Sequence, residues 1–427
     1  MANVLLVNPR ITPAHKARFP LSLLALAAAL AGRHTVRIVD GNKAADDGTA
    51  ATVQALVQER FDVVGLTVMG GPQVRTAIDV SRAVRDVAPG TPVAWGGYFP
   101  TLYPDAALNA PYVDHLVRGQ GEAPLAALLD GLDAGATAFD GIAGLSWKRG
   151  DERVHNADAA FAPTFPGPLP YDLLGDPRRY LIPTYIGART VMHQAALGCR
   201  FRCTFCGVAA MFRGATALPP AARLEQDLAY LRDTVGADSV QFCDHNFFDR
   251  EEDTAPLLEV LARAGMDWWC YARSDALLGL SPESWALVRR SRLRMAYIGA
   301  ESPNDALLRD IRKGTRSDQT LEVAELCRRH RVVPELSFMV APPHDPDGET
   351  ERTFEFIREV KRVNPAAEIV IYVYTPLPAG SLPGNARARA STLPLVDADG
   401  RPIVFPASPE EWTERRWVDY ACHADAP

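Results

Sequence analysis

The first third of the chain alternates short apolar runs with longer segments whose apolar residues recur at helical spacing. The runs are rich in β-branched residues, which is typical of parallel strands buried on both faces. They cover residues 4–7, 36–39, 63–67, 93–95 and 115–117. Amphipathic helix patterns fall between or after them, for example at residues 21–31, 73–87 and 123–132. This alternation predicts a doubly wound α/β sheet, whose ligand site lies beyond the carboxyl ends of its strands.

A second alternating series begins at Thr190. Its strand patterns cover residues 190–196, 239–243, 268–273, 296–299, 335–340 and 368–374. Helix patterns lie between them at residues 221–234, 251–264, 281–291, 319–329 and 349–363. Six β/α units in succession predict a partial barrel rather than a complete eight-unit one.

The segment between the two series is of a different kind. Residues 145–155 have the pattern of a hairpin that turns at 149–151, and residues 161–170 are rich in proline and glycine. We therefore predict a Rossmann-like domain at 1–140, a hairpin and proline-rich linker at 141–188, a partial (β/α)6 barrel at 189–380 and a C-terminal extension at 381–427. The extension ends without a clear stop signal, so we expect that the natural chain can continue beyond it.

Composition narrows the class of protein. The 427 residues are 47% hydrophobic and 23% charged, which is typical of a globular protein of two or three domains. The net charge of −7 argues against a general nucleic-acid-binding surface. The amino terminus reads as a first strand rather than a signal peptide, and no segment approaches the ~20 apolar residues of a membrane span. We expect a cytoplasmic protein.

Three of the seven cysteines lie in one short loop, Cys199, Cys203 and Cys206, at the spacing C-x3-C-x2-C. The other four are scattered singly, and we expect them to be small buried hydrophobic residues. They are Cys243, Cys270, Cys327 and Cys422. This distribution is not a disulfide framework, and a reducing compartment fits it best.

Three thiolates in one loop indicate a metal centre with a vacancy. Thiolates are strong ligands for iron–sulfur clusters and for zinc, but a structural zinc site takes four protein ligands. Zinc is the alternative interpretation, with His193 or His245 as the fourth ligand. A cubane of four irons held by three thiolates instead leaves one iron open for chemistry. The loop follows the first strand of the second series, at the face where β/α barrels place their active sites.

With Phe205 before its last cysteine, the loop resembles the signature of the radical S-adenosylmethionine (SAM) superfamily. The resemblance implies a [4Fe–4S] cluster on the three cysteines, with SAM bound to the open iron. One-electron cleavage of SAM would then produce a 5′-deoxyadenosyl radical that abstracts hydrogen from the substrate. The protein would position the reactants and exclude side reactions. The resemblance also implies an electron donor such as a flavodoxin or a ferredoxin.

Later strand ends look similar to the SAM contacts of that superfamily. With Phe205, the implied SAM-binding residues are Asp244, Asn246, Arg273, Ser274, Glu301, Ser302 and Tyr374. Asp244 and Asn246 replace a motif that is usually rich in glycine, and Glu301 would bind the amine or the ribose. Two alternatives stay open: Glu301 and Arg273 form an ion pair with each other, and Tyr374 only turns the chain instead of lining the adenine pocket.

Two further groups of side chains have more than one interpretation. Arginines flank the cysteine loop, where they would favour cluster reduction or dock an acidic donor, or are simply solvated. They are Arg200, Arg202 and Arg213. Aromatic residues near the second and third strands would line an apolar substrate pocket or belong to the barrel core. They are Phe247, Phe248, Trp268, Trp269 and Tyr271.

The N-terminal series resembles the cobalamin-binding domain of B12-dependent radical SAM enzymes, through residues 67–73, 95–104 and 117–122. The implied cobalamin contacts are Asn8, Asn42, Thr67, Gly70, Gln73, Gly96, Gly97 and Glu122. None of the nine histidines lies in a D-x-H-x-x-G pattern, and Asn42 stands where the histidine would be. We therefore expect cobalamin without a histidine ligand. The alternatives are loops that only form tight turns and a domain that has lost its cofactor.

The two resemblances together imply a cobalamin-dependent methyltransferase that acts on an unactivated carbon or phosphorus of a small biosynthetic intermediate. One alternative is an enzyme of the same architecture that cyclises or rearranges its substrate or transfers an aminocarboxypropyl group. Another is a non-catalytic corrin- or metal-binding module.

Overall fold

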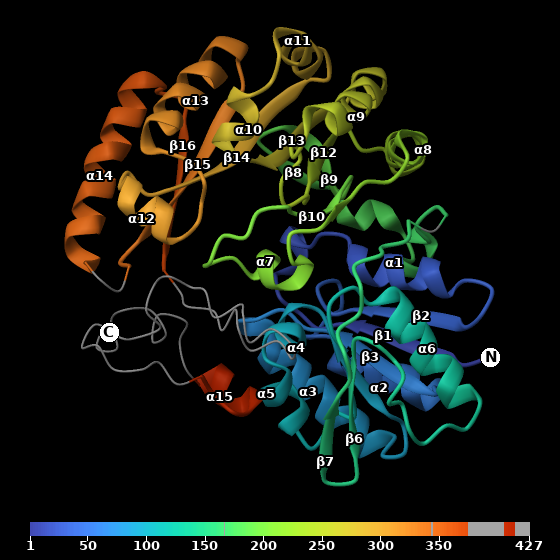
Figure 1. Ribbon diagram of the computed structural model, residues 1–427. Coiled ribbons are helices and arrows are strands. Elements are labelled where there is room, and N and C mark those ends of the chain that lie inside the picture. The colour runs from blue at the N-terminus through green and yellow to red at the C-terminus, as the bar shows by residue number, and fades with distance from the viewer. Residues whose placement is uncertain (166, 343–344, 375–404, 415–427) are drawn as a thin grey trace. The chain divides into compact units, whose positions relative to one another are not determined.

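The computed structural model describes residues 1–165, 167–342, 345–374 and 405–414, and these residues form two compact units (Figure 1). The first unit contains residues 1–180 and 405–414, and the second contains residues 181–374. Cys422 and most of the predicted C-terminal extension lie outside the described residues. No helix among the described residues is both long enough and apolar enough to span a bilayer.

The first unit is built on a seven-stranded sheet with the order β2-β1-β3-β4-β5-β6-β7. The strands are β1 (Asn3–Asn8), β2 (Thr35–Asp40), β3 (Val63–Thr67), β4 (Val93–Gly96), β5 (His115–Val117), β6 (Leu145–Arg149) and β7 (Glu152–His155). The first five are parallel to one another. The order 2-1-3-4-5 confirms the predicted doubly wound sheet and places the switch of winding direction between β1 and β3.

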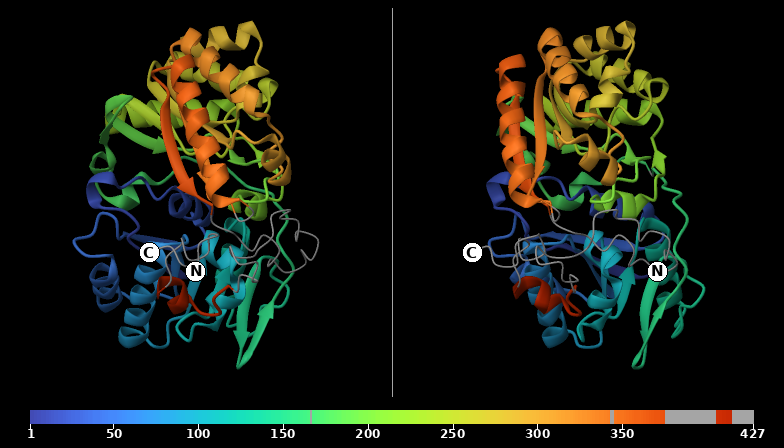
Figure 2. Two further views of the ribbon diagram at one scale, coloured as in Figure 1. Left: turned by 90° about the vertical axis from the view of Figure 1, so that its left-hand side faces the viewer. Right: turned by 60° about the vertical axis from the view of Figure 1, so that its left-hand side comes forward.

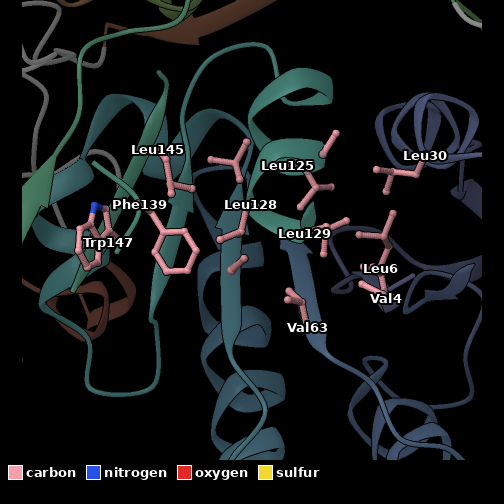
Figure 3. Close-up of a cluster of buried hydrophobic side chains, with 14 of the residues drawn as sticks. Val4, Leu6, Leu30, Val63, Leu125, Leu128, Leu129, Phe139, Leu145 and Trp147 are labelled. Atoms are coloured by element: carbon pink, nitrogen blue, oxygen red, sulfur yellow. The ribbon is translucent and has the colours of Figure 1, made fainter. Parts of the chain in front are cut away.

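Helices connect these strands and bury their apolar faces. They are α1 (Leu21–Leu30), α2 (Thr49–Gln58), α3 (Pro72–Val87), α4 (Tyr98–Leu102), α5 (Pro104–Asn109) and α6 (Glu122–Asp133). Figure 3 shows Leu125, Leu128 and Leu129 of α6 among side chains of the central strands, in a buried cluster that continues to Trp147 of β6. The strands need apolar side chains on both faces, which explains the short continuous runs in the sequence.

Two later segments belong to this first unit. The hairpin β6–β7 pairs antiparallel with β5, so residues 145–155 extend the first sheet instead of forming part of a connector. The short helix α15 (Pro409–Glu414) also packs on this unit, where Trp412 lies between rings that include Phe99 and Tyr103. The buried Trp412 side chain ties residues 405–414 to the helices that follow β4.

The second unit contains another seven-stranded sheet, in the order β16-β15-β14-β13-β12-β9-β8. Its strands are β8 (Ile182–Thr184), β9 (Gly187–His193), β12 (Ser239–Phe242), β13 (Asp267–Ala272), β14 (Leu293–Glu301), β15 (Val333–Val340) and β16 (Glu368–Val373). The six strands from β9 to β16 are parallel, and β8 is an antiparallel edge strand. This confirms the predicted partial barrel of six β/α units.

The connections of the second sheet are mostly helical. They contain α7 (Gly207–Phe212), α8 (Ala221–Tyr230), α9 (Glu251–Ala264), α10 (Ser274–Leu278), α11 (Pro282–Arg290), α12 (Asp305–Asp310), α13 (Ser317–His330) and α14 (Pro346–Val363). A small ribbon of β10 (Leu197–Gly198) and β11 (Thr216–Ala217) brackets α7. Figures 1 and 2 show α9, α11, α13 and α14 along one side of the curved sheet.

The aromatic residues near β12 and β13 separate onto the two faces of this sheet. Trp268 is fully buried and packs against Phe247, with 4.8 Å between the ring centroids, and Phe248 lies beside them. These three belong to the core under the helices. Trp269 and Tyr271 alternate along β13 with Trp268 and Cys270 and therefore point to the other face.

Candidate active site

The three cysteines lie in the loop that joins β10 to α7. Gly198 begins the loop with φ of 82°, and a Cβ there would lie 2.1 Å from the carbonyl oxygen of Ala215, so this position requires glycine. Within the loop, the Cys206 amide donates to the Cys203 carbonyl at 3.2 Å, and the Thr204 amide donates to the Ile311 carbonyl at 3.0 Å. The loop is therefore anchored at the end of α12.

None of the three thiols of this loop is in a disulfide, so all three are available as metal ligands. Burial raises the pKa of Cys199 and raises that of Cys206 to about 11, and neighbouring thiols add to both shifts. Among the described residues, no group of three or more His, Cys, Asp or Glu side chains can hold one metal ion. In the zinc alternative, His193 or His245 would be the fourth ligand. His193 Nε2 instead lies 3.3 Å from Asp227, and the His245 ring packs against Phe212 with 5.0 Å between the ring centroids. Thiolates of an iron–sulfur cubane each bind a different iron, which fits separate thiols.

Arg273 connects this loop to the end of β13. Its guanidinium lies 3.5 Å from the ring centroid of Phe201, and its Nη1 is 4.0 Å from the Cys203 sulfur. It also binds Asp275 through two hydrogen bonds of 2.9 Å and donates to the Lys313 carbonyl at 2.6 Å. Arg273 therefore fixes the cysteine loop to the end of β13 and to the segment that follows α12.

Glu301 pairs with Lys313, not with Arg273. Lys313 Nζ lies 2.6 Å from one carboxylate oxygen, and the Tyr372 hydroxyl donates to the other. Glu301 and Lys313 are both buried, so the alternative of an ion pair between Glu301 and Arg273 is wrong. Glu301 has φ of 64°, and a Cβ on Gly299 would lie 2.2 Å from its carboxylate, so glycine is needed there. The local backbone is thus shaped around one buried ion pair.

Asp244 and Asn246 follow β12, as predicted, and both are almost completely buried. Asp244 accepts a hydrogen bond from the Ala195 amide at 3.1 Å, just upstream of the cysteine loop. Asn246 donates to Asp249 at 3.1 Å. Burial raises the pKa of Asp244 to about 7. The hydrogen bond of Asp244 thus holds the chain that leads into the cysteine loop.

The other predicted SAM residues are also buried. Ser302 accepts from the Asn304 amide at 2.9 Å, and Phe205 packs against the apolar cluster that contains Ile311 and Tyr374. Tyr374 is 2% exposed. Ser274 is 1% exposed at the start of α10. These side chains surround the carboxyl ends of the parallel strands, on the elements that the sequence predicted.

Several buried polar atoms at this edge have no partner among the described residues. They are the side-chain oxygens Thr204 Oγ1, Asp244 Oδ1, Asn246 Oδ1, Asp249 Oδ2 and Ser274 Oγ. Leaving such atoms without a hydrogen bond costs about 1–3 kcal/mol each, so their grouping indicates a polar ligand. The residues present therefore fit a cluster on the cysteines with a polar cofactor beside it.

The arginines that flank the loop have local partners. Arg200 binds Asp249 at 3.1 Å and lies over the Phe201 ring, while Arg202 donates to the Arg213 carbonyl at 3.0 Å. A cavity of about 400 Å³ opens beside Arg200. Its lining includes Phe248, Asp249, Glu251, Glu252, Asp275 and Leu280.

In the first unit, the predicted polar residues bind one another. Gln73 donates to Asn8 at 3.0 Å and to the Pro9 carbonyl at 2.6 Å, and it accepts from the Met69 amide at 2.7 Å. Asn42 accepts from the amides of Ile11 and Thr12. These bonds fix the loops that follow β1, β2 and β3 beside the switch point.

The remaining predicted residues of this edge are mostly backbone features. Thr67 and Gly96 end neighbouring parallel strands, and Gly70 precedes α3. Gly97 has φ of 97°, and a Cβ there would lie 3.0 Å from the Val68 carbonyl oxygen. Glu122 accepts from Gln120, and burial raises its pKa. An edge made of glycine turns and braced amides fits a large ligand held through the backbone and its shape.

Comparisons with known proteins define the class. Residues 14–129 match the B12 binding domain family, and residues 195–357 match the Radical SAM superfamily. The chain thus carries a B12-binding domain followed by a radical SAM domain, which confirms the predicted resemblance, and it is an enzyme. The predicted cofactors, a [4Fe–4S] cluster, SAM and cobalamin, are confirmed at the level of these two families.

Individual relatives are more distant. The chain is 25% identical to the uncharacterised methyltransferase PH0819 of Pyrococcus horikoshii over 354 residues, 80% of this chain and 73% of that protein. It is also 25% identical to the anaerobic magnesium-protoporphyrin IX monomethyl ester cyclase of Synechocystis, over 66% of this chain and 54% of that protein. The match thus spans only about half of the cyclase.

A solved structure shares the fold over almost the whole chain. The radical SAM methyltransferase TsrM of Kitasatospora setae, with tryptophan substrate and a SAM analogue bound, superimposes with a TM-score of 0.73. The superposition covers 96% of this chain and 82% of TsrM, at 19% sequence identity. At this identity, the likeness concerns the fold.

Sequence reasoning missed Lys313 and Tyr372 as partners of Glu301. Tyr372 lies on β16, and Lys313 follows α12, so the contacts join segments that are distant in the sequence. The only signal in the sequence was Lys313 in the polar motif at residues 312–315, which follows the fourth strand of the barrel.

Proposed function

We propose that the protein is a cobalamin-dependent radical SAM methyltransferase that acts on an unactivated carbon or phosphorus of a small biosynthetic intermediate. The observation that carries this proposal is the combination in one chain of two sites. A C-x3-C-x2-C loop lies at the carboxyl ends of a six-stranded parallel half-barrel, and a 2-1-3-4-5 sheet of the B12-binding family precedes it. The methyltransferase names of PH0819 and TsrM, and the tryptophan bound to TsrM, support methylation of a small molecule.

In this proposal, Cys199, Cys203 and Cys206 are the cluster ligands. When bound, the cluster with SAM supplies the 5′-deoxyadenosyl radical, and cobalamin supplies the methyl group. Arg273 holds its charge beside Cys203 and keeps the loop against β13. The unpartnered oxygens of Thr204, Asn246 and Ser274 are available to a polar cofactor.

The remaining predicted SAM residues have supporting roles here. Glu301 and Lys313 form a fixed pair of opposite charges. The dipole of this pair orients the polar groups of SAM, and the pair stays intact when SAM binds. Asp244 braces the entrance to the cysteine loop, and Ser302 braces the turn after β14. Phe205 and Tyr374 form part of the apolar wall against which the loop packs.

The proposed cobalamin site is the carboxyl edge of the first sheet, within a domain at residues 1–140. Thr67, Gly70, Gly96 and Gly97 offer backbone at that edge. Asn8, Asn42, Gln73 and Glu122 keep its loops in place through the hydrogen bonds described above. The barrel domain is proposed at residues 189–380.

The proposal includes a protein that delivers electrons. A flavodoxin or a ferredoxin in a reducing cytoplasm would dock beside the cysteine loop. Arg200 is about half exposed, and the neighbouring cavity opens on the same side of the loop. Arg202 and Arg213 lie in the same segment and add positive charge to it.

Anaerobic reconstitution of the full chain with iron, sulfide and cobalamin, followed by product analysis, tests this function. We expect corrin absorption in the purified protein. Turnover with SAM, a strong reductant and substrate should yield 5′-deoxyadenosine together with S-adenosylhomocysteine. Absence of bound corrin after reconstitution would contradict the cobalamin half of the proposal.

The similarity to the Synechocystis cyclase favours a second candidate, an enzyme that uses the same radical without methylation. The same experiment separates the two. Consumption of SAM that gives 5′-deoxyadenosine without S-adenosylhomocysteine indicates cyclisation or rearrangement. Methylthioadenosine instead indicates transfer of the aminocarboxypropyl group.

A further inference from the structure

The central strands of the second sheet have two faces of different character. Residues that point to the helices are buried and apolar, for example Cys270, Ile298 and Leu336, each at 0% exposure. Many of the residues that alternate with them are only partly buried, and they include aromatic and polar side chains. They include Gln241, Tyr271, Tyr297, Glu335 and Tyr372. In a curved sheet with helices along one side, this second set lines the inner face.

One row of this inner face crosses four strands. Tyr271 of β13 pairs in register with Tyr297 of β14, which pairs with Glu335 of β15, and Glu335 pairs with Glu368 of β16. Register partners on neighbouring parallel strands point to the same face. Trp269 lies one row away on the same face and donates its indole N–H to Glu335 at 2.9 Å.

The three rings of this region form a compact wall. The ring centroids of Trp269 and Tyr271 are 4.6 Å apart, those of Tyr271 and Tyr297 are 5.0 Å apart, and all pairs meet edge to face. Edge-to-face packing leaves the electron-rich face of some rings available to a neighbour. Such faces attract cations, and most strongly where water is partly excluded.

Glu335 completes the wall with a negative charge that lacks a counter-ion. Within the part of the chain that the structure describes, its carboxylate has one hydrogen-bond donor, the neutral Trp269 indole, and no Lys or Arg partner. Burial raises the pKa of Glu335, and the like charge of Glu368 adds to this effect, so the ionised carboxylate lacks a compensating charge among the described residues. A half-buried carboxylate usually has a cation nearby, since desolvation of an unpaired charge is costly.

This row is continuous with the layer of the proposed SAM residues. Tyr297 lies near enough to both Glu301 and Glu335 that each carboxylate contributes to raising its pKa, after the larger effect of burial. Along a strand, residues on one face are spaced by ~7 Å. Tyr297, which is in the same row as Glu335, lies two such steps before Glu301 at the end of β14. A substrate that reaches from the cofactor layer into the half-barrel meets Glu335.

We propose that the substrate carries a cationic nitrogen, such as an alkylammonium group, and that Glu335 with the rings of Trp269, Tyr271 and Tyr297 binds it on the inner face of the half-barrel. The inference rests on the proposed function, because it takes this face as the wall of the substrate chamber. It adds a substrate class and a specificity determinant. The carboxylate supplies the counter-ion, and the rings exclude water and stabilise the charge.

The direct test compares two probes of equal size on the reconstituted full chain. Phenethylammonium carries the charge, and 2-phenylethanol replaces the ammonium group with a neutral hydroxyl. By isothermal titration calorimetry, we expect the native protein to bind the cation about tenfold more tightly than the alcohol, which is the size of one partly buried charge pair. Equal affinities for the two probes would overturn the inference.

Variants then locate the preference. Glu335→Gln keeps an acceptor for the Trp269 indole and should reduce the preference from about tenfold to less than about twofold. The matched control is Glu368→Gln, which removes the neighbouring carboxylate on the exposed edge of the sheet and should keep most of the preference. Tyr271→Leu should weaken cation binding about threefold through loss of one ring face. If Glu368→Gln abolished the preference and Glu335→Gln did not, the site would be elsewhere.

The binding measurement does not depend on whether the protein catalyses the proposed reaction. Iron content and the thermal unfolding curve establish that each variant is folded. A native protein that prefers the cation but yields no methylated product retains the binding inference and rejects the function. A protein that methylates its substrate but shows no preference retains the function and rejects the inference.

Discussion

The carboxyl edges of the two sheets use polar side chains in opposite ways. At the edge of the first sheet, Asn8, Asn42 and Gln73 bind one another or the backbone of neighbouring loops. At the edge of the second sheet, buried oxygens of residues such as Asn246 and Ser274 have no partner among the described residues. The predicted side chains of the first edge thus satisfy one another, whereas several side chains of the second edge keep atoms that are available to a ligand.

This difference matches the ligands of the two families. A corrin is large and rigid, and a preformed edge of braced loops and glycine turns can hold it by shape. SAM is small, flexible and rich in polar groups, so its site needs side-chain atoms that are free to bind it. The second edge also contains the buried pair Glu301–Lys313, which has no equivalent among the predicted residues of the first edge.

The largest expected effect is at the cysteine loop. Cys203→Ala should reduce the cluster content to background and abolish cleavage of SAM, because the cubane loses one of its three protein ligands. Iron and sulfide analysis with electron paramagnetic resonance measures the cluster, and chromatography measures 5′-deoxyadenosine. Cys327→Ala is the matched control, since Cys327 is a buried thiol on α13 and its loss should leave the iron content unchanged. A full cubane in Cys203→Ala would show that the ligands lie elsewhere.

The next effect concerns the buried ion pair of the second edge. Lys313→Met leaves the Glu301 carboxylate buried with only the Tyr372 hydroxyl, and should lower the free energy of unfolding by about 3–5 kcal/mol. Urea denaturation measures this change. The double variant Lys313→Met with Glu301→Gln should recover a large part of the loss, because no charge is then left unpaired. As a control, replacing Glu325 by Gln in the exposed pair Arg328–Glu325 should leave the free energy of unfolding nearly unchanged. Equal losses at the two pairs would contradict the assignment.

At the carboxyl edge of the first sheet, a substitution that strains the backbone should have a larger effect on stability than the loss of one polar side chain. Gly97→Ala places a side chain on a residue with φ of 97° and within 3.0 Å of the Val68 carbonyl oxygen. We expect a loss of about 1–3 kcal/mol in the free energy of unfolding and weaker binding of cobalamin. Gly90→Ala is the control, since a Cβ added at Gly90 would meet no heavy atom of the described residues within 4 Å. Titration of the apo protein with cobalamin, followed by corrin absorption, measures the second effect. If Gly97→Ala bound cobalamin with native affinity, this edge would not be the cobalamin site.

The sequence was sufficient for most elements of both sheets. β3 and β5 have their predicted bounds, and α9 does as well, because short β-branched runs and amphipathic periodicity are local signals. Helix α2 was not predicted, since Thr49–Gln58 is rich in alanine and threonine and has no capping residue. The hairpin β6–β7 was predicted as a hairpin, but its pairing with β5 depends on a contact that no local pattern encodes.

The sequence predicts where the candidate site lies, but it predicts the contacts between the site residues less well. Periodicity places Asp244, Arg273 and Glu301 at consecutive strand ends, so the edge of the barrel follows from the sequence. The choice of partners depends on loop lengths and backbone angles: Arg273 reaches Asp275 rather than Glu301, and Lys313 returns to Glu301 after α12. Such pairing is decided by tertiary packing, and the roles of the individual residues stay predictions.

The smallest expected effect is a pH dependence at the second edge. Burial raises the pKa of Asp244 to about 7 from its ordinary value of 3.8. Because the folded protein then holds the proton more tightly than the unfolded chain, the stabilisation is complete below about pH 4 and is lost as the pH rises through 7. Between pH 6 and pH 8, this carboxyl group should lower the free energy of unfolding by about 1 kcal/mol.

Asp244→Asn isolates this contribution, since the amide oxygen can still accept from the Ala195 amide but does not ionise. Denaturation of the protein without SAM at pH 6 and pH 8 should show a shallower decrease for the variant than for the native chain. The neighbouring thiols Cys243 and Cys270 stay protonated over this range, because burial raises the pKa of both. SAM should reduce the difference if its cationic amine pairs with the ionised carboxyl group, as the sequence predicts. If SAM leaves the difference unchanged, Asp244 braces the cysteine loop and does not contact the cofactor.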